Sequence, residues 1–179
     1  RGDDREVETP FQLTRDIDMD VCRACGACAF VCPTGAITLD DIRWEHCNVK
    51  AITLLPNVLL RQQAVDAGTA EAILIRQYYA TEGAASNLFI IDHDLLITPP
   101  KGPTLLPGIT RYLILELAAN HGIPFREADI PLEQLRNAGE IWLTSSTREI
   151  SPVTRLDDRS IGDGKPGPHW QRMIRIYRK

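Results

Sequence analysis

The chain has 179 residues, of which 44% are hydrophobic, so it is long enough to bury one ordinary core and to carry a small additional segment. Its 20 Lys and Arg against 24 Asp and Glu give a net charge of −4, and the absence of a basic block or an arginine-aromatic stripe argues against nucleic-acid binding. No apolar run reaches the roughly 18 residues of a membrane span, and no charged-then-apolar leader opens the sequence. We therefore expect a cytoplasmic protein that binds no membrane and acts on small molecules.

Four of the five cysteines fall within eleven positions, in the run Cys22-Arg-Ala-Cys25-Gly-Ala-Cys28-Ala-Phe-Val-Cys32-Pro. Disulfides within so short a stretch would close strained loops, whereas a metal site brings such thiolates to one point. Zinc usually takes two CxxC pairs held apart by a longer spacer, and this order instead resembles the bacterial ferredoxin run, which implies ligands to a [4Fe-4S] cluster. A structural zinc site and free thiols are the alternatives.

The fourth ligand of such a cluster is left open. In two-cluster ferredoxins the last cysteine of the run ligates the other cluster, and this chain has no second run. The ligand is therefore Cys32 by an unusual route, Cys47, or a group from another chain.

Beyond Asp41 the pattern changes to alternating short strands and helices. The residues from Val49 to Leu55 alternate enough to predict a strand, and Pro56 then opens a helix that ends at Gly68. The next predicted strands suggest a meander with a turn at residues 92–94, and they span residues 71–76, 87–91 and 95–98.

A helix is predicted over residues 108–120, because its apolar residues have helical spacing and His121-Gly122 follows them. The remaining expected elements are a short helix at 131–138, strands at 141–143 and 152–156, a rigid loop at 161–168 and a closing helix at 170–177. The fold class is α/β or α+β with a mixed sheet. We place an iron–sulfur segment at residues 1–42 and one larger domain at residues 43–179.

Five motifs of the larger domain follow one another in the order found in the fold-type IV pyridoxal-phosphate aminotransferases. They are CNVK at 47–50, TEG at 81–83 with NLF at 87–89, LPGITR at 106–111, TSSTREISPV at 144–153 and IGDGKPGP at 161–168. Over about residues 43–178 the chain most resembles D-amino-acid (D-alanine) aminotransferase. The resemblance implies the large C-terminal domain of that fold, pyridoxal 5′-phosphate as cofactor, and D-amino acid and 2-oxo acid substrates. Branched-chain aminotransferase and aminodeoxychorismate lyase are the near alternatives.

The resemblance gives Lys50 and Glu82 their expected roles. Lys50 lies among Val49, Ala51 and Ile52 rather than in a charge run, which suits a lysine that needs a usable neutral fraction, although composition alone would make it an ordinary strand-edge residue. The family lysine at this position binds the cofactor and, once released, moves a proton between the substrate Cα and the cofactor's C4′. Glu82 matches the carboxylate that keeps the cofactor's ring nitrogen protonated; without the motif it is a turn carboxylate.

The remaining expected contacts to the cofactor concern its ring and its phosphate. By resemblance, Leu106 packs on the ring, Ile109 and Thr110 cradle the phosphate, and Ser146 and Thr147 close the phosphate site from the other side. The start of a helix suits this role, because it offers free backbone N–H groups and the positive end of the dipole. Taken alone, these residues form only a helix cap and an ordinary hydroxyl-rich turn.

Two functions therefore compete. The first is transamination, in a homodimer as the resemblance implies. The second is electron transfer by Cys22, Cys25, Cys28 and Cys32, with the larger domain as a scaffold. Family members also carry a smaller N-terminal domain that supplies an arginine to the phosphate, holds the substrate carboxylate and forms one wall of the cleft. We do not recognise that domain in this sequence, so we expect impaired transamination.

Overall fold

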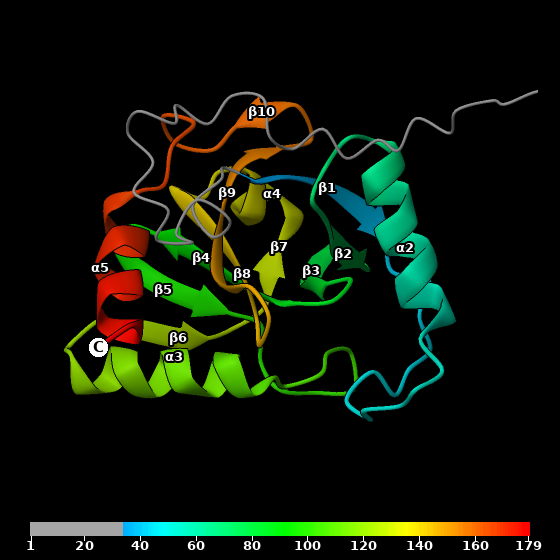
Figure 1. The fold of residues 1–179 in the computed structure, drawn as a ribbon, viewed down its shortest axis with the longest axis horizontal. Coiled ribbons are helices and arrows are strands. Elements are labelled where there is room, and N and C mark those ends of the chain that lie inside the picture. The colour runs from blue at the N-terminus through cyan, green and yellow to red at the C-terminus, as the bar shows by residue number, and fades with distance from the viewer. Residues whose placement is uncertain (1–33) are drawn as a thin grey trace, which may run out of the picture.

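The computed structural model describes residues 34–179, and the cysteine run Cys22 to Cys32 lies outside the described residues. One mixed sheet runs through the fold in the order β6-β5-β4-β8-β9-β1-β2-β3-β7, with β10 paired to β9 (Figure 1). The elements are β1 (Thr34–Asp40), α2 (Leu55–Asp66), β2 (Glu71–Arg76), β3 (Tyr79–Gly83), β4 (Asn87–Asp92), β5 (Leu95–Thr98), α3 (Ile109–Asn120), β6 (Phe125–Glu127), β7 (Ile130–Pro131), α4 (Leu132–Arg136), β8 (Glu140–Ser145), β9 (Glu149–Leu156), β10 (Arg159–Ser160) and α5 (Pro168–Tyr177).

Strand β1 occupies the middle of the sheet. It runs parallel to β2 on one side, with Ala36 opposite Glu71, and parallel to β9 on the other, with Ala36 opposite Leu156. It is thus the only strand within residues 34–179 that joins the β2-β3-β7 half to the β9-β8-β4 half. The sheet begins at residue 34, ahead of the boundary that the sequence suggested near Asp41.

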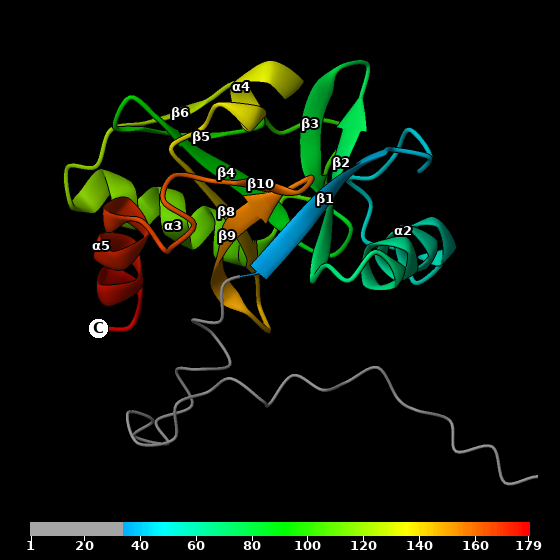
Figure 2. The same cartoon turned by 90° about the horizontal axis from the view of Figure 1, so that it is seen from above.

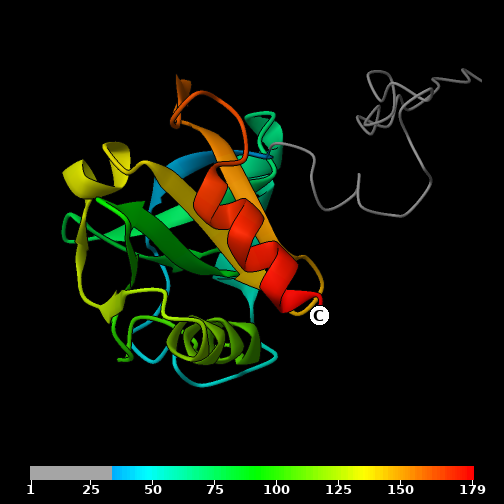
Figure 3. The ribbon, with the colours of Figure 1, turned by 90° about the vertical axis from the view of Figure 1, so that its left-hand side faces the viewer.

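Alternation along the strands makes both faces of the sheet apolar. Leu88 and Ile90 of β4 belong to a cluster on one face, together with Ile73 and Ile75 of β2 from the other half of the sheet. Phe89 and its neighbours on the opposite face pack under α3 and α5, and α2 covers the β1-β2 half (Figures 1 and 2). Figure 3 shows α5 lying along β8 and β9. The mixed sheet with helices confirms the predicted fold class.

Helix α2 confirms the helix predicted from Pro56, which lies in its first turn, and it ends before Gly68, whose φ is +70°. The predicted strand over residues 49–55 is wrong, because residues 49–54 form a loop and Leu55 is the first residue of α2. Their alternating side chains have no neighbouring strand to pair with, and Ile52 is fully exposed. A period-2 pattern without a partner is therefore not sufficient for a strand.

The remaining predicted helices and strands are confirmed to within a few residues. The turn at residues 92–94 is confirmed too, with His93 and Asp94 at φ 47° and 64°. The predicted meander is wrong, because β2 and β4 are separated in the sheet by β1, β9 and β8. Strand β3, with the polar sequence YATEG, was not predicted, and it forms a hairpin with β2. None of the helices within residues 34–179 is long and apolar enough to cross a membrane.

The attachment of α2 to the sheet can be tested on two neighbouring leucines. Leu60 is buried against the β1-β2 half, whereas Leu59 is 47% exposed. We expect Leu60→Ala to lower the free energy of unfolding by about 2–5 kcal/mol, because it leaves a cavity under the helix. Leu59→Ala should change it by no more than about 0.5 kcal/mol. Urea unfolding of both variants measures the difference, and equal effects would show that α2 does not depend on this anchor.

Candidate functional site

A cavity of about 430 Å³ is lined by residues of α2, the start of α3 and the β8-β9 turn. This volume lies within the usual range for small-molecule sites. The cavity brings together six of the predicted site residues, namely Lys50, Glu82, Leu106, Ile109, Thr110 and Ser146. The seventh, Thr147, does not line it; its hydroxyl lies 3.3 Å from the Ser145 hydroxyl on the same turn.

Lys50 lies in the loop between β1 and α2, and its side chain is exposed. The neighbours that were expected to desolvate it are themselves exposed, Val49 at 52% and Ile52 completely. The loop is held at its start by Arg76, whose Nη2 donates to the carbonyl oxygens of Arg43 and Trp44 at 2.9 and 3.1 Å. Lys50 also lines a second cavity of about 510 Å³, which adjoins the first.

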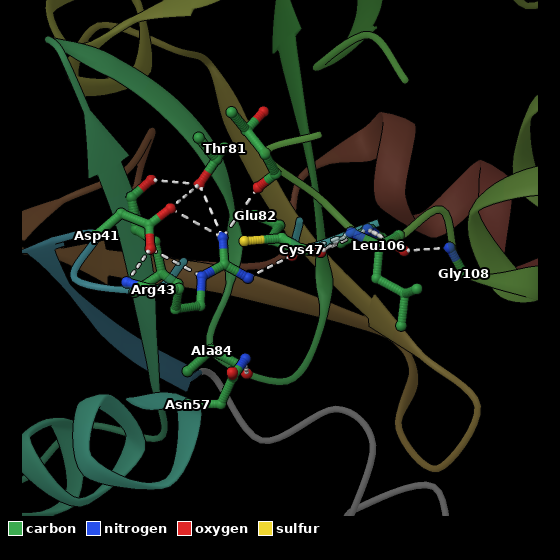
Figure 4. A network of polar contacts seen from close by, with 12 residues as sticks. Asp41, Arg43, Cys47, Asn57, Thr81, Glu82, Ala84, Leu106 and Gly108 are labelled. Carbon is green, nitrogen blue, oxygen red and sulfur yellow. Dashed lines mark hydrogen bonds and ion pairs between the residues drawn. The ribbon is translucent and has the colours of Figure 1, made fainter. Parts of the chain in front are cut away.

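Glu82, near the end of β3, is a carboxylate only 5% exposed. It accepts hydrogen bonds from Arg43 Nη1 at 2.5 Å and from the Leu106 backbone N–H at 3.1 Å (Figure 4). It also accepts one from Asn87 Nδ2 at 3.1 Å. Burial raises the pKa of Glu82 to about 7, against the Arg43 guanidinium and the Leu106 amide, which lower it.

Arg43 was not predicted as a site residue. It is 8% exposed and its guanidinium lies between two carboxylates, Asp41 at 2.8 Å from Nε and Glu82 at 2.5 Å from Nη1 (Figure 4). Its sequence neighbours Ile42 and Trp44 are 59% and 54% exposed. The usual rule of apolar residues inside and arginine outside is thus inverted here, and the sequence carries no signal for it.

Asn87, the first residue of β4, links Glu82 to the start of α3 and was also missed as a site residue. Its Nδ2 donates to Glu82 and to the Leu106 carbonyl, and its Oδ1 accepts from the Gly108 N–H at 3.0 Å. A Cβ on Gly108 would lie 2.5 Å from this Oδ1, so the close approach requires glycine.

Helix α3 begins at the cavity wall with Ile109 and Thr110. Within the described residues, no side chain caps its start. Its first backbone N–H groups therefore remain available to an anion, and the helix dipole favours negative charge there. Thr110 is buried and Ile109 is 78% exposed.

The cavity carries hydrogen-bond donors suited to pyridoxal phosphate, including one buried hydroxyl whose hydrogen-bonding capacity is unused. Ser86 Oγ, which lies over Gly83, is buried at the cavity wall without a hydrogen-bond partner in the described part of the chain. The amides at the start of α3 and the hydroxyls of Thr110 and Ser146 suit a phosphate, Glu82 suits a protonated ring nitrogen, and Lys50 offers an amine.

Residues 34–179 hold no group of three or more His, Cys, Asp or Glu side chains that could bind a metal ion. Cys47, one of the alternatives for the last cluster ligand, is buried and its Sγ lies 3.1 Å from the Trp44 carbonyl oxygen. Burial raises the pKa of this thiol. The predicted ligands Cys22, Cys25, Cys28 and Cys32 lie outside the described residues.

Comparison with family models gives two matches. The amino-transferase class IV model matches residues 34–156, and the 4Fe-4S binding domain model matches residues 15–38. The two matches overlap at residues 34–38, which form the first part of β1. This stretch is therefore similar to both families, and the structure places it in the sheet.

Several individual proteins resemble the chain. D-alanine aminotransferase of Bacillus licheniformis is 42% identical over 133 residues, covering 74% of this chain and 47% of that protein. The protein of the same name from Staphylococcus aureus (strain MSSA476) is 40% identical over 143 residues, covering 80% and 51%.

Solved structures show the same relationship. The branched-chain amino acid aminotransferase of Escherichia coli has a TM-score of 0.74 at 30% identity, and its match covers 83% of this chain and 52% of the other. The branched-chain aminotransferase of the archaeon Thermoproteus uzoniensis, solved with norvaline, has a TM-score of 0.74 at 28% identity, covering 82% and 50%. The chain spans about half the length of the curated relatives it matches. Because the class IV model covers most of the chain and the fold is shared, the chain belongs to the class IV aminotransferases.

Proposed function

We propose that this chain is a pyridoxal-phosphate-dependent aminotransferase, which transfers the amino group of a D-amino acid such as D-alanine to a 2-oxo acid. The observation that carries the proposal is the one cavity that gathers Lys50, Glu82, Leu106, Ile109, Thr110 and Ser146. We propose D-amino acids rather than branched-chain amino acids as substrates. The relatives named D-alanine aminotransferase are about 40% identical to the chain, whereas the two branched-chain aminotransferase structures are 30% identical or less.

Lys50 is the proposed catalytic residue. When bound, the cofactor draws electrons away from the substrate Cα and so weakens its bond to hydrogen. The Lys50 amine would hold the cofactor by a covalent bond and, when released, would move a proton between the substrate Cα and the cofactor's C4′. Its place in an exposed loop gives the side chain room for both tasks.

Glu82 is proposed to hold a proton at the cofactor's ring nitrogen. Arg43 positions it, because the guanidinium fixes Oε1 while the Leu106 amide and Asn87 fix the carboxylate from other sides. With its pKa near 7, the carboxylate is poised between its charged and neutral forms, and a cationic group beside it favours the charged form.

The phosphate is proposed to lie at the start of α3, where Ile109 and Thr110 offer backbone N–H groups and Ser146 adds a hydroxyl. Leu106 packs against the ring. Thr147 completes this side of the site only if the β8-β9 turn changes conformation, since its side chain lies off the cavity.

The proposal includes a homodimer in the cytoplasm. Leu54 and Val58 line the cavity and are exposed, and Ile52, Leu55 and Leu59 are exposed on the same loop and helix. Such an apolar surface is expected where further protein packs.

A second candidate function is electron transfer by an iron–sulfur cluster. The match of residues 15–38 to the 4Fe-4S binding domain favours it, together with the spacing of Cys22, Cys25, Cys28 and Cys32. It is compatible with the first function if the two sites act independently.

Covalent trapping of the cofactor separates the two functions. Borohydride reduction of the full chain with excess pyridoxal phosphate should leave a phosphopyridoxyl group on Lys50, detected by peptide mass spectrometry. Lys50→Ala should abolish the label, whereas Cys25→Ser should retain it and lose iron. An unlabelled Lys50 in the unaltered chain would contradict the proposed function, and loss of label in Cys25→Ser would show that the two sites are coupled.

The pH dependence of stability tests the state of Glu82. Its folded pKa of about 7 exceeds the ordinary value of 4.5, so between these pH values the folded chain holds a proton that the unfolded chain releases. The free energy of unfolding should therefore fall as pH rises through this window, by up to about 1.4 kcal/mol per pH unit. Urea unfolding of Glu82→Gln should lack this component; an identical slope in the variant would mean that Glu82 is ionised throughout.

Removal of Arg43 should leave the buried Glu82 carboxylate without its ion-pair partner and Asp41 with Arg76 alone. We expect Arg43→Met to lower the free energy of unfolding by about 3–5 kcal/mol at pH 8. The deficit should shrink at pH 5, where Glu82 is neutral in the folded chain. Arg155→Met is the control, because the Arg155–Asp158 pair is exposed at 61% and 90% and should contribute little. A pH-independent deficit would argue against the role given to Glu82.

A further inference from the structure

Two cationic side chains line the cavity, Lys50 and Arg61. The sequence motifs account for Lys50 but not for Arg61. Arg61 lies on α2 one turn after Asn57 and Val58, which line the same cavity. Residues three and four apart share a helix face, so this face of α2 is turned toward the cavity and carries Arg61 with it.

Arg61 lines the same cavity as the proposed phosphate donors. The Lys50 end is shared with the adjoining cavity through Lys50, Leu54, Asn57, Glu82 and Leu106. The residues found only in the first cavity include Arg61, Thr110 and Ser146. Arg61 therefore lines the first cavity together with these proposed phosphate donors and does not line the adjoining one.

A chain of contacts links Arg61 to the β8-β9 turn. Arg61 Nη1 lies 3.1 Å from Glu71 Oε2, and Arg148 Nη1 lies 3.8 Å from the same oxygen. The backbone N–H of Arg148 donates to Ser145 Oγ at 3.1 Å, and Ser145 lines the cavity. Glu71 thus holds two guanidinium groups, one on α2 and one on the β8-β9 turn.

The charges of this cluster do not cancel. Two guanidinium groups share Glu71, which is only 2% exposed, so the cluster carries one net positive charge when Glu71 is ionised. Arg61 itself is 39% exposed, and the only ion pair that it makes within the described residues uses Nη1 alone. A guanidinium has five N–H donors, so most of them remain available to an anion.

We propose that Arg61 is the cation that binds the cofactor's phosphate in this chain, with Glu71 and Arg148 as positioning residues. This proposal rests on the proposed function, since it concerns the same cofactor. It assigns the neutralising charge to the domain described here, and it makes the site selective for a phosphorylated cofactor over its unphosphorylated form. If Arg61 only neutralised Glu71, its loss would affect both forms equally.

The test compares pyridoxal phosphate with pyridoxal on the full chain. Binding of each is measured by absorbance titration and by borohydride labelling of Lys50. Arg61→Met should weaken binding of pyridoxal phosphate by about 10- to 100-fold, as expected for loss of a charge-assisted contact, and should leave binding of pyridoxal within about 2-fold. Arg61→Lys should recover part of the loss. Arg175→Met, on the exposed face of α5, is the matched control and should bind both as the unaltered chain does.

Inorganic phosphate provides a readout that needs no covalent chemistry. Added phosphate should raise the melting temperature of the unaltered chain and of Arg175→Met, and should not raise that of Arg61→Met. Because Arg61→Met leaves Glu71 with Arg148 alone, the double variant Arg61→Met with Glu71→Gln serves if the single variant does not fold. It should show the same loss of phosphate binding.

The outcomes separate the two proposals. An unchanged preference for pyridoxal phosphate over pyridoxal, or equal stabilisation of all variants by phosphate, would overturn the role of Arg61. If Lys50 stays unlabelled in the unaltered chain while phosphate stabilises it and not Arg61→Met, the proposed function fails and the anion site at Arg61 stands.

Discussion

The burial of Glu82 is the constraint around which the candidate site is arranged. A carboxylate taken out of water is costly unless donors surround it, and here each donor comes from a different segment. Arg43 comes from the loop after β1, Asn87 from β4 and the amide of Leu106 from the segment before α3. Satisfying one side chain therefore fixes the relative positions of a strand pair, the loop that carries Lys50 and the start of a helix.

The same donors are used more than once, which joins the site to the fold. Asn87 is also the first residue of a strand that pairs with β8, and its side chain reaches Gly108 at the start of α3. Arg43 is held by Asp41, which follows β1, and Asp41 is held in turn by Arg76 at the end of β2. The polar network is thus an extension of the parallel pairing of β1 and β2, since both strands end at it.

Sequence periodicity was sufficient to predict the helices and strands whose packing partners are close to them in the sequence. Helix α3 and strands β4 and β5 follow from their own side chains, and hairpin β4-β5 from its turn. Periodicity gave wrong predictions where strand formation or strand pairing depends on residues far away in the sequence. Residues 49–55 alternate like a strand but have no strand beside them, and β2 pairs with β1 and β3 rather than with β4.

The candidate site divides in the same way. Lys50, Glu82 and the start of α3 were found because motifs mark them, and the fold brings them to one cavity. Arg43, Asn87 and Arg61 lie outside those assignments, because their importance comes from what they contact across the fold. Thr147 shows the reverse case, since it follows Ser146 in the motif but its side chain lies off the cavity. The motif identifies the β8-β9 turn, but the backbone conformation of that turn decides which of its side chains point into the cavity.

The central position of β1 has a consequence for where the polypeptide can be divided. Removing an edge strand of a sheet breaks the hydrogen bonds to one neighbouring strand only, and that neighbour then becomes the edge strand. Cutting the chain after residue 40 would instead remove hydrogen bonds to β2 and β9 together and expose two unpaired edges facing each other across a gap. Two facing edges are complementary to any free strand, including one from another molecule. A gene fragment or domain boundary drawn at the end of the ferredoxin-like stretch would thus produce a chain prone to strand exchange.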